Sequence, residues 1–155
     1  MQRNTMRRRT MLLGGLAVLT GAALPAFAAP RPTIEVYKDP NCGCCGEWVK
    51  HVEANGFAVS VRNVGNAAAR ARLGIPARLG SCHTGEIAGY AIEGHVPARE
   101  IKRLLAEKPA AKGLAVPGMP IGSPGMEQGA RRESYDVLLV RADGGTSVFA
   151  AYAAQ

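Results

Sequence analysis

Four cysteines are the residues best suited to chemistry in this chain of 155 residues. Three of them, Cys42, Cys44 and Cys45, fall within four consecutive positions, and the fourth, Cys82, directly precedes His83. The thiolate form of cysteine attacks disulfides and binds soft metal ions. The cluster is therefore predicted to serve either thiol–disulfide exchange or the binding of a soft metal.

The cysteine cluster lies between a predicted strand and a predicted helix. Residues 33–38 alternate between apolar and polar side chains, which indicates a strand. A helix is expected from Cys44 or Cys45 to Asn55, with apolar side chains spaced three and four positions apart. The start of a helix offers unpaired N–H groups and a positive dipole end, and both stabilise thiolates. We therefore expect reactive thiolates at this turn.

The remaining elements favour an α/β fold. We expect, in order, a strand, a short helix, a turn, an edge strand, a helix and two strands of a hairpin, at residues 57–64, 66–73, 84–89, 90–96, 98–107, 135–141 and 146–152. A strand, a helix and a second strand in succession argue for a parallel β-α-β unit. With a C-x-x-C from Cys42 to Cys45 at the first helix, the pattern predicts a thioredoxin-like fold, a central mixed β-sheet flanked by helices.

Residues 113–129 break this alternation, because five glycines and three prolines occur there among 17 positions. No regular element is expected in such a segment. Its apolar residues include Met119 and Met126, and a disordered linker does not favour apolar side chains. We predict an ordered Gly/Pro-rich lid loop. The thioethers of Met119 and Met126 could bind Cu(I), or the two side chains could fill gaps beneath the loop.

The spacing of the thiols favours one metal over others. Four converging thiolates repel one another unless cations share their charge. Zinc sites use two separated chelating pairs, whereas Cys42, Cys44 and Cys45 put three sulfurs on one turn, which suits bridging Cu(I) better than Zn²⁺ or an iron–sulfur cluster. His83 could add a ligand or be a structural residue.

Two alternatives use the same cysteines without a metal. One is a thiol–disulfide oxidoreductase, in which Cys42 attacks and Cys45 resolves. The other is a purely structural role, either with Cys42–Cys45 and Cys44–Cys82 bonds or with one bond and two free thiols. Of the other candidate side chains, Trp48 is expected in the core, His51 on the exposed helix face, and His95 as a capping or packing residue.

Residues 1–28 have the features of an export signal. A basic start precedes an apolar stretch and the sequence Ala26-Phe27-Ala28, an A-x-A-type cleavage site. The alternative, a retained membrane anchor, requires about 20 apolar residues, more than this stretch supplies. Arg8-Arg9 also matches a twin-arginine signal loosely. We expect cleavage after Ala28, a single domain over 29–155 with no stable membrane anchor, and a periplasmic location, where disulfides persist.

Charge argues against a nucleic-acid partner. The formal net charge is +7, but the leader contributes four arginines and no acidic residue, so 15 basic and 12 acidic residues remain, a net of +3. No long basic run is left, and only 5% of residues are aromatic, which gives bases little to stack on.

Four motifs together resemble the CopG-like family of periplasmic, thioredoxin-like proteins linked to copper resistance. They are DPNCGCC at 39–45, LGSCHTG at 79–85, IEGHVPA at 92–98 and GLAVPGMPIGSPGME at 113–127, within a resemblance that spans 33–152. The resemblance implies a Cu(I)–thiolate site of Cys42, Cys44, Cys45 and Cys82, with a role in sequestering, transferring or changing the oxidation state of copper. Copper ions, and other periplasmic copper-handling proteins, are the partners that it implies.

Overall fold

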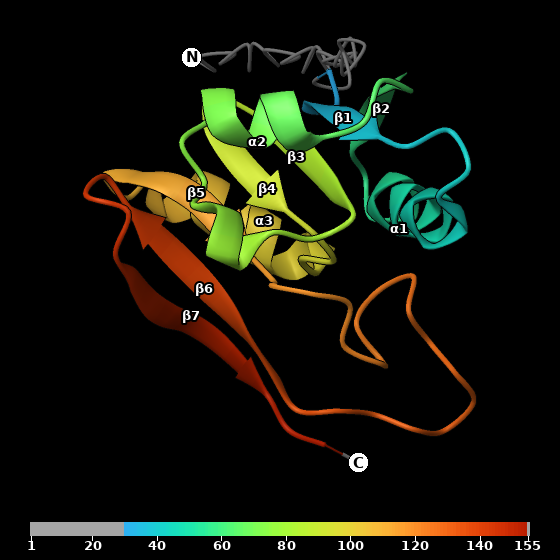
Figure 1. Ribbon diagram of the computed structural model, residues 1–155. Coiled ribbons are helices and arrows are strands. Elements are labelled where there is room, and N and C mark those ends of the chain that lie inside the picture. Colours follow the sequence, from blue (N-terminus) through green and yellow to red (C-terminus); the bar gives the residue numbers. More distant parts are fainter. Residues whose placement is uncertain (1–29, 155) are drawn as a thin grey trace, which may run out of the picture.

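The computed structural model describes residues 30–154, so the predicted export signal at 1–28 lies outside the described residues. The described part contains a seven-stranded mixed sheet in the order β2-β1-β3-β4-β5-β6-β7 (Figure 1). Its elements are β1 (Thr33–Lys38), α1 (Gly43–Ala54), β2 (Ala58–Arg62), α2 (Ala67–Arg72), the 3₁₀ helix η1 (Ala77–Leu79), β3 (His83–Ile87), β4 (Tyr90–Glu93), α3 (Ala98–Glu107), β5 (Ala111–Ala115), β6 (Tyr135–Arg141) and β7 (Thr146–Tyr152).

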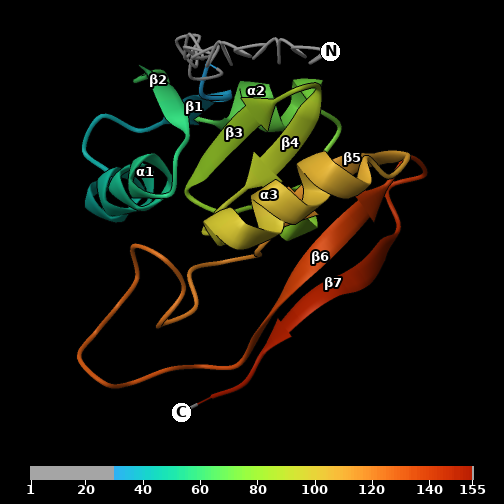
Figure 2. The ribbon, with the colours of Figure 1, turned by 180° about the vertical axis from the view of Figure 1, so that it is seen from behind.

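Helices cover both faces of the sheet (Figures 1 and 2). The larger core joins α1 and α3 to one face and contains Trp48, Ile92 and Leu104. The smaller core lies beneath α2 and η1 and contains Leu79 and Ala91. Neighbouring strand residues such as Ala91 and Ile92 fall into different cores because successive side chains of a strand point to opposite faces. No helix of the described residues is long and apolar enough to cross a membrane.

The predicted β-α-β unit and the final hairpin are confirmed. β1 and β2 pair in parallel on either side of α1 in the sequence, and β6 and β7 occupy the predicted ranges and pair antiparallel. The mixed sheet with flanking helices confirms the α/β class. That this α/β fold is thioredoxin-like stays a prediction.

The prediction for residues 84–96 was wrong in two respects. The segment 84–89 was expected to be a turn, but β3 runs through most of it, between β1 and β4. The following strand, β4, was expected at an edge and instead lies inside the sheet. Only Ala88 and Gly89 form the turn, both with positive φ. The polar composition of β3 hid the strand, because its stability comes from pairing on both sides rather than from its own apolar pattern.

The lid prediction was wrong at its first residues, since Gly113 to Ala115 belong to β5. A Cβ at Gly113 would lie 1.8 Å from the carbonyl oxygen of Ala91, so this close approach of β4 and β5 requires glycine. From 116 to 129, which we call the lid, the chain has no helix or strand but is ordered by hydrogen bonds. The Gly122 N–H donates to the Met126 carbonyl, and the Ser123 hydroxyl donates to the Pro120 carbonyl.

Candidate metal site

The cysteine turn is shaped by local hydrogen bonds at the end of β1. Cys42 is the N-cap of α1 in extended conformation, and its N–H donates to the Asp39 carbonyl over 3.1 Å. The Asp39 carboxylate accepts the Asn41 N–H over 2.8 Å. The side chain of Cys42 makes no capping hydrogen bond to the helix. The turn therefore leaves the sulfurs at the N-terminus of α1, as the sequence predicted.

The structure brings the four predicted cysteines together. Cys42 and Cys45 form a disulfide, while Cys44 and Cys82 are free thiols. The Sγ atom of Cys44 lies 3.6 Å from that of Cys42 and 3.7 Å from that of Cys82. All four sulfurs lie within 4.8 Å of one another. Of the bonding patterns considered, the structure has one bond with two free thiols, and it places Cys44 between the disulfide and Cys82.

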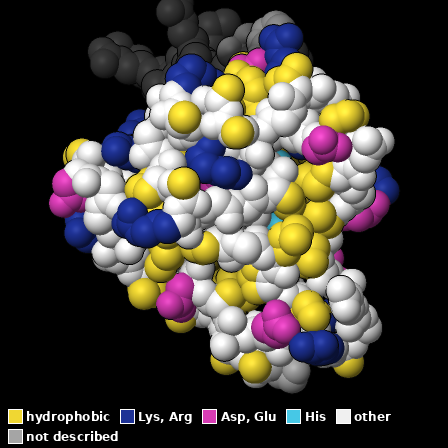
Figure 3. All heavy atoms as spheres, viewed as in Figure 1, with side chains coloured by type: hydrophobic (Ala, Val, Ile, Leu, Met, Phe, Trp, Pro, Cys, Tyr) yellow, Lys and Arg dark blue, Asp and Glu magenta, His cyan; other side chains and the backbone are white. Residues whose placement is uncertain are grey.

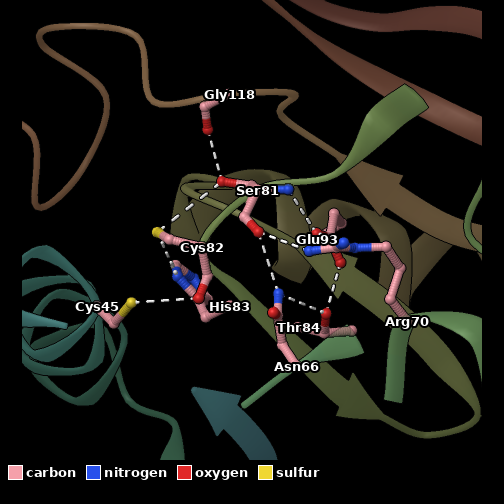
Figure 4. A network of polar contacts seen from close by, with 9 residues as sticks. All are labelled: Cys45, Asn66, Arg70, Ser81, Cys82, His83, Thr84, Glu93 and Gly118. Atoms are coloured by element: carbon pink, nitrogen blue, oxygen red, sulfur yellow. Dashed lines mark hydrogen bonds and ion pairs between the residues drawn. The ribbon is translucent and has the colours of Figure 1, made fainter. Parts of the chain in front are cut away.

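Cys82 is positioned by a buried polar network around Glu93 (Figure 4). The fully buried Glu93 carboxylate accepts hydrogen bonds from the Ser81 N–H, the Thr84 hydroxyl and Nε of Arg70, over 2.7, 2.6 and 2.8 Å. Arg70 also donates to the Ser81 carbonyl over 2.6 Å. Burial raises the pKa of Glu93, and these donors oppose the rise by stabilising the carboxylate. The network holds the backbone of Ser81, the residue before Cys82, in place.

The protonation state of Cys82 differs from the thiolate that the sequence led us to expect at the cysteine cluster. Burial, followed by the nearby Cys44, raises the pKa of Cys82 to about 12. Cys82 lies after η1 and not on the N-terminal turn of α1. Without a cation its sulfur therefore holds its proton at neutral pH, and a bound metal must supply the positive charge that stabilises its thiolate.

Two histidines lie beside the Cys82 thiol. Nε2 of His95 lies 3.1 Å from the Sγ atom of Cys82, and Nδ1 of His83 lies 3.5 Å from it. Cys82, His83 and His95 each offer one ligand atom within 4.8 Å of the others. The sequence interpretation considered His83 but assigned His95 a capping or packing role. The signal that could have found His95 was its place in the IEGHVPA motif.

Both imidazoles are fully buried among aromatic groups. The His83 ring lies 4.4 Å from the Trp48 ring and 4.9 Å from the His95 ring, between centroids. Burial, followed by the neighbouring His95, lowers the pKa of His83 to about 3. Burial also lowers the pKa of His95. Both rings are therefore neutral at physiological pH, and each keeps a nitrogen lone pair.

The lid closes over the cysteines at two points. At its start, the Gly118 carbonyl accepts the Ser81 hydroxyl over 2.5 Å, as Figure 4 shows. Further along, a Cβ at Gly125 would lie 2.8 Å from the Cys44 carbonyl oxygen and 2.7 Å from the Trp48 nitrogen. The lid backbone thus touches both the Cys82 segment and the first turns of α1.

The two lid methionines differ in exposure. Met119 is 52% exposed, so it does not fill a gap beneath the lid, whereas Met126 is half-buried. Ligation of copper by either thioether stays a prediction. In the view of Figure 3, hydrophobic side chains, a class that there includes cysteine and methionine, gather beside α1. Charged side chains lie around these hydrophobic ones on the same face.

Two further expectations concern α1. Trp48 is fully buried, as predicted, and its indole N–H donates to the Val96 carbonyl over 2.9 Å. His51 was expected to be exposed, and this was wrong: it is half-buried, and its Nε2 accepts the Ala98 N–H over 3.1 Å. The imidazole thereby satisfies a backbone donor at the start of α3, which the sequence of α1 alone does not reveal.

Comparisons with known proteins give a consistent result. A family model described as a protein of unknown function, DUF411, matches residues 79–126. Two solved structures, titled copper resistance protein CopG form 1 and form 2, are 49% and 50% identical to this chain. Each match covers 79% of this chain and 98% of that structure, with a TM-score of 0.75. A search of the curated proteins gives no match. At this identity and coverage, the chain belongs to the family of the copper resistance protein CopG.

Proposed function

We propose that this protein binds Cu(I) through the thiolates of Cys42, Cys44, Cys45 and Cys82 and acts in copper handling in the periplasm. The observation that carries the proposal is the place of Cys44, whose sulfur lies 3.6 and 3.7 Å from the sulfurs of Cys42 and Cys82. Sulfurs so close to one another can bridge soft metal ions. Sequestration, transfer and a change of copper oxidation state are the roles that such a site can support.

Cu(I) fits the arrangement better than Zn²⁺. Three of the sulfurs share one helical turn, and Cu(I) accepts two or three bridging thiolates, whereas a structural zinc site needs four ligands placed tetrahedrally. Binding through all four sulfurs requires reduction of the Cys42–Cys45 bond by two electrons and removal of the thiol protons. The pKa of Cys82 is raised to about 12, so a cation must bind its sulfur strongly to displace the proton, which is released to solvent.

The relatives and the leader support the cellular setting. The two similar structures are titled copper resistance proteins, which supports copper as the cargo. The basic and apolar leader at 1–28 supports export, by a twin-arginine route if Arg8-Arg9 is read as such, and release of a single domain at 29–155. Copper ions and other periplasmic copper-handling proteins are then its partners, and Met119 and Met126 are secondary candidates for contact with copper.

The alternative is a thiol–disulfide oxidoreductase that uses Cys42 and Cys45. The bond between these two residues is the observation in its favour. An exchange enzyme, however, has no need of a third thiol at Cys44 or a fourth at Cys82. The resemblance to copper resistance proteins also favours copper over disulfide exchange.

A Cu(I) titration separates the two functions. The exported protein is reduced, titrated with Cu(I) without oxygen and then challenged with a Cu(I) chelator. Copper binding predicts retention of at least one equivalent, and a lower stoichiometry in Cys44→Ser. Disulfide exchange predicts no retention, a readily reducible Cys42–Cys45 bond, and full dithiol activity in Cys44→Ser. Ser60→Ala, on the exposed part of β2, is a control that should match the wild type in both measurements.

A further inference from the structure

We propose that a pocket between the lid and the β6–β7 hairpin binds a free α-amino acid with an apolar or aromatic side chain. The pocket has a volume of about 240 Å³, and its lining contains no cysteine or histidine. Pockets for drug-sized ligands measure about 300–1,000 Å³, so this one suits a smaller molecule. The lining residues that carry the argument are Pro97, Pro124, Arg132, Glu133, Tyr135 and Tyr152.

The guanidinium of Arg132 supplies a positive charge that is held in place. Its Nη1 donates to the carbonyls of Gly129 and Arg131 over 2.9 and 2.8 Å. Its aliphatic part lies against Gly122, where an added Cβ would overlap the Cδ atom of Arg132. Its Nε and Nη2 have no hydrogen-bond partner among the described residues. A guanidinium with two free nitrogens suits a carboxylate, which it can bind through two parallel hydrogen bonds.

The carboxylate of Glu133 places a negative charge in the same pocket. One of its oxygens accepts the Ile121 N–H over 3.0 Å, and the other accepts Nη2 of Arg131 over 2.9 Å. Each carboxylate oxygen can accept more than one hydrogen bond, so Glu133 can still accept a ligand ammonium. One cation and one anion together favour a ligand that carries both charges, and they argue against a phosphate or a metal ion.

The other walls of the pocket are mainly apolar. The rings of Tyr135 and Tyr152 stack with their centroids 4.6 Å apart and 5° between their planes. The Tyr152 hydroxyl donates to the buried Glu100 over 3.0 Å, which fixes the pair, and Pro97 and Pro124 are buried. The Tyr135 hydroxyl has no partner among the described residues, and burial raises the pKa of Tyr135, so it stays a donor for a ligand oxygen. Proline and tyrosine surfaces favour an apolar or aromatic side chain on the ligand.

Backbone hydrogen bonds hold the pocket open before any ligand binds. The Ile121 carbonyl accepts the Glu133 N–H over 2.8 Å, which ties the lid to the segment that carries Arg132. Within the lid, the Gly122 N–H donates to the Met126 carbonyl over 3.0 Å. A preformed pocket spares a ligand the cost of ordering the chain around it, which favours binding of a small molecule.

The test uses metal-free protein, so its outcome does not depend on copper binding. L-phenylalanine, phenylacetate, 2-phenylethylamine and glycine are titrated separately into isotope-labelled protein, and amide chemical shifts are followed by NMR. Phenylacetate lacks the ammonium, 2-phenylethylamine lacks the carboxylate, and glycine lacks the side chain. We expect L-phenylalanine to cause saturable shifts at Gly122, Tyr135 and Ala153, which line the pocket. Each of the other three compounds should bind at least about tenfold more weakly.

Two variants make the same substitution inside and outside the pocket. Arg132→Gln should weaken binding of L-phenylalanine by at least about tenfold. Arg78→Gln is the control and should match the wild type, because the exposed Arg78 donates to the Gly144 carbonyl and does not line the pocket.

Three results overturn the inference: no saturable binding of L-phenylalanine, equal binding of all four compounds, or unchanged affinity in a folded Arg132→Gln protein. The comparison of the four compounds on the wild type decides the matter even if Arg132→Gln fails to fold, which its NMR spectrum reports. Failure of the proposed copper function is a separate result, because it is measured as lost retention of Cu(I).

Discussion

The two sides of Cys82 are built by different means. On one side, Cys42, Cys44 and Cys45 lie on a single turn and need only the start of α1 to bring their sulfurs together. On the other side, His83 begins β3 and His95 follows β4, and they meet through strand pairing and the contact between Pro124 and His95. The cysteine turn is local, whereas the histidine pair depends on the sheet and the lid.

This difference predicts unequal sensitivity to damage elsewhere in the molecule. A local turn keeps its geometry as long as α1 forms, because its hydrogen bonds span few residues. The histidine pair and Cys82 depend on the buried network around Glu93 and on closure of the lid. Changes to the network or to the lid should therefore disturb Cys82 and the histidines before they disturb the cysteine turn.

The largest effect is expected from Glu93→Ala. It leaves the Ser81 N–H, the Thr84 hydroxyl and the half-buried Arg70 without their shared acceptor. Loss of one partner of a buried ion pair costs about 3–5 kcal/mol in the free energy of unfolding, which denaturant titration measures. Glu86→Ala is the control, since its ion pair with Arg72 is partly exposed to solvent and should contribute less than about 1 kcal/mol. Equal losses in the two variants would contradict the role given to the network.

The second-largest effect is expected from Cys82→Ser. It removes a sulfur that lies 3.7 Å from that of Cys44, so the affinity for Cu(I) should fall by about 100-fold, or roughly 2.8 kcal/mol. Competition with a Cu(I) chelator measures the change. Ser60→Ala, on the exposed part of β2, is the control and should keep the wild-type affinity. An unchanged affinity in Cys82→Ser would show that this thiol is not a ligand.

Gly125→Ala tests closure of the lid. Gly125 has a φ of +83°, and its new Cβ would collide with the backbone of Cys44 and Trp48, so the lid must shift at a cost of about 1–3 kcal/mol. We expect faster release of copper to the chelator. Gly129→Ala introduces the same residue at a φ of +58° with no atom within 4 Å, so it reproduces the backbone strain without the collision. Similar release rates in both variants would show that lid contact does not protect the site.

The smallest effect concerns His51, away from both groups. Burial lowers the pKa of His51 below its ordinary value of 6.5, with Glu127 opposing the change. As pH falls below 6.5, the unfolded chain takes up this proton before the folded protein does, so the free energy of unfolding decreases. The Ala98 N–H also loses its acceptor when His51 is protonated. Denaturant titrations at pH 7.5 and 5.5 should show a smaller pH-dependent loss in His51→Gln than in the wild type, and an equal loss would refute this assignment.

Residues 33–55 show what sequence patterns can establish. The alternation of β1, the helical spacing of Trp48 and Val52, and the C-x-C-C spacing each depend on neighbours within one or two turns. The hairpin of β6 and β7 was equally readable, because Asp143 and the two following glycines favour a tight turn. Such local signals correctly predicted where three sulfurs converge.

β3 and His95 show where these patterns fail. β3 has a polar sequence and is a strand because β1 and β4 pair with it on both sides. His95 lies between β4 and α3, and apart from its place in the IEGHVPA motif no helical or strand pattern marks it as part of a site. Its contacts are with Cys82 and Pro124, which are 13 and 29 residues away. The periods of a helix and a strand, 3.6 and 2 residues, cannot reveal contacts between residues so far apart in the sequence.

Local sequence patterns were enough to predict the cysteine turn at the start of α1, the α/β class and the glycine- and proline-rich lid. Backbone propensity and side-chain spacing act over a few residues, so these features follow from local physics. The folded structure was needed to show that Cys82 joins the turn, that β3 lies within the sheet, and that His83 and His95 lie beside the same sulfur. Those outcomes depend on the order in which strands pair and on burial shared by distant segments, which no single stretch of sequence specifies.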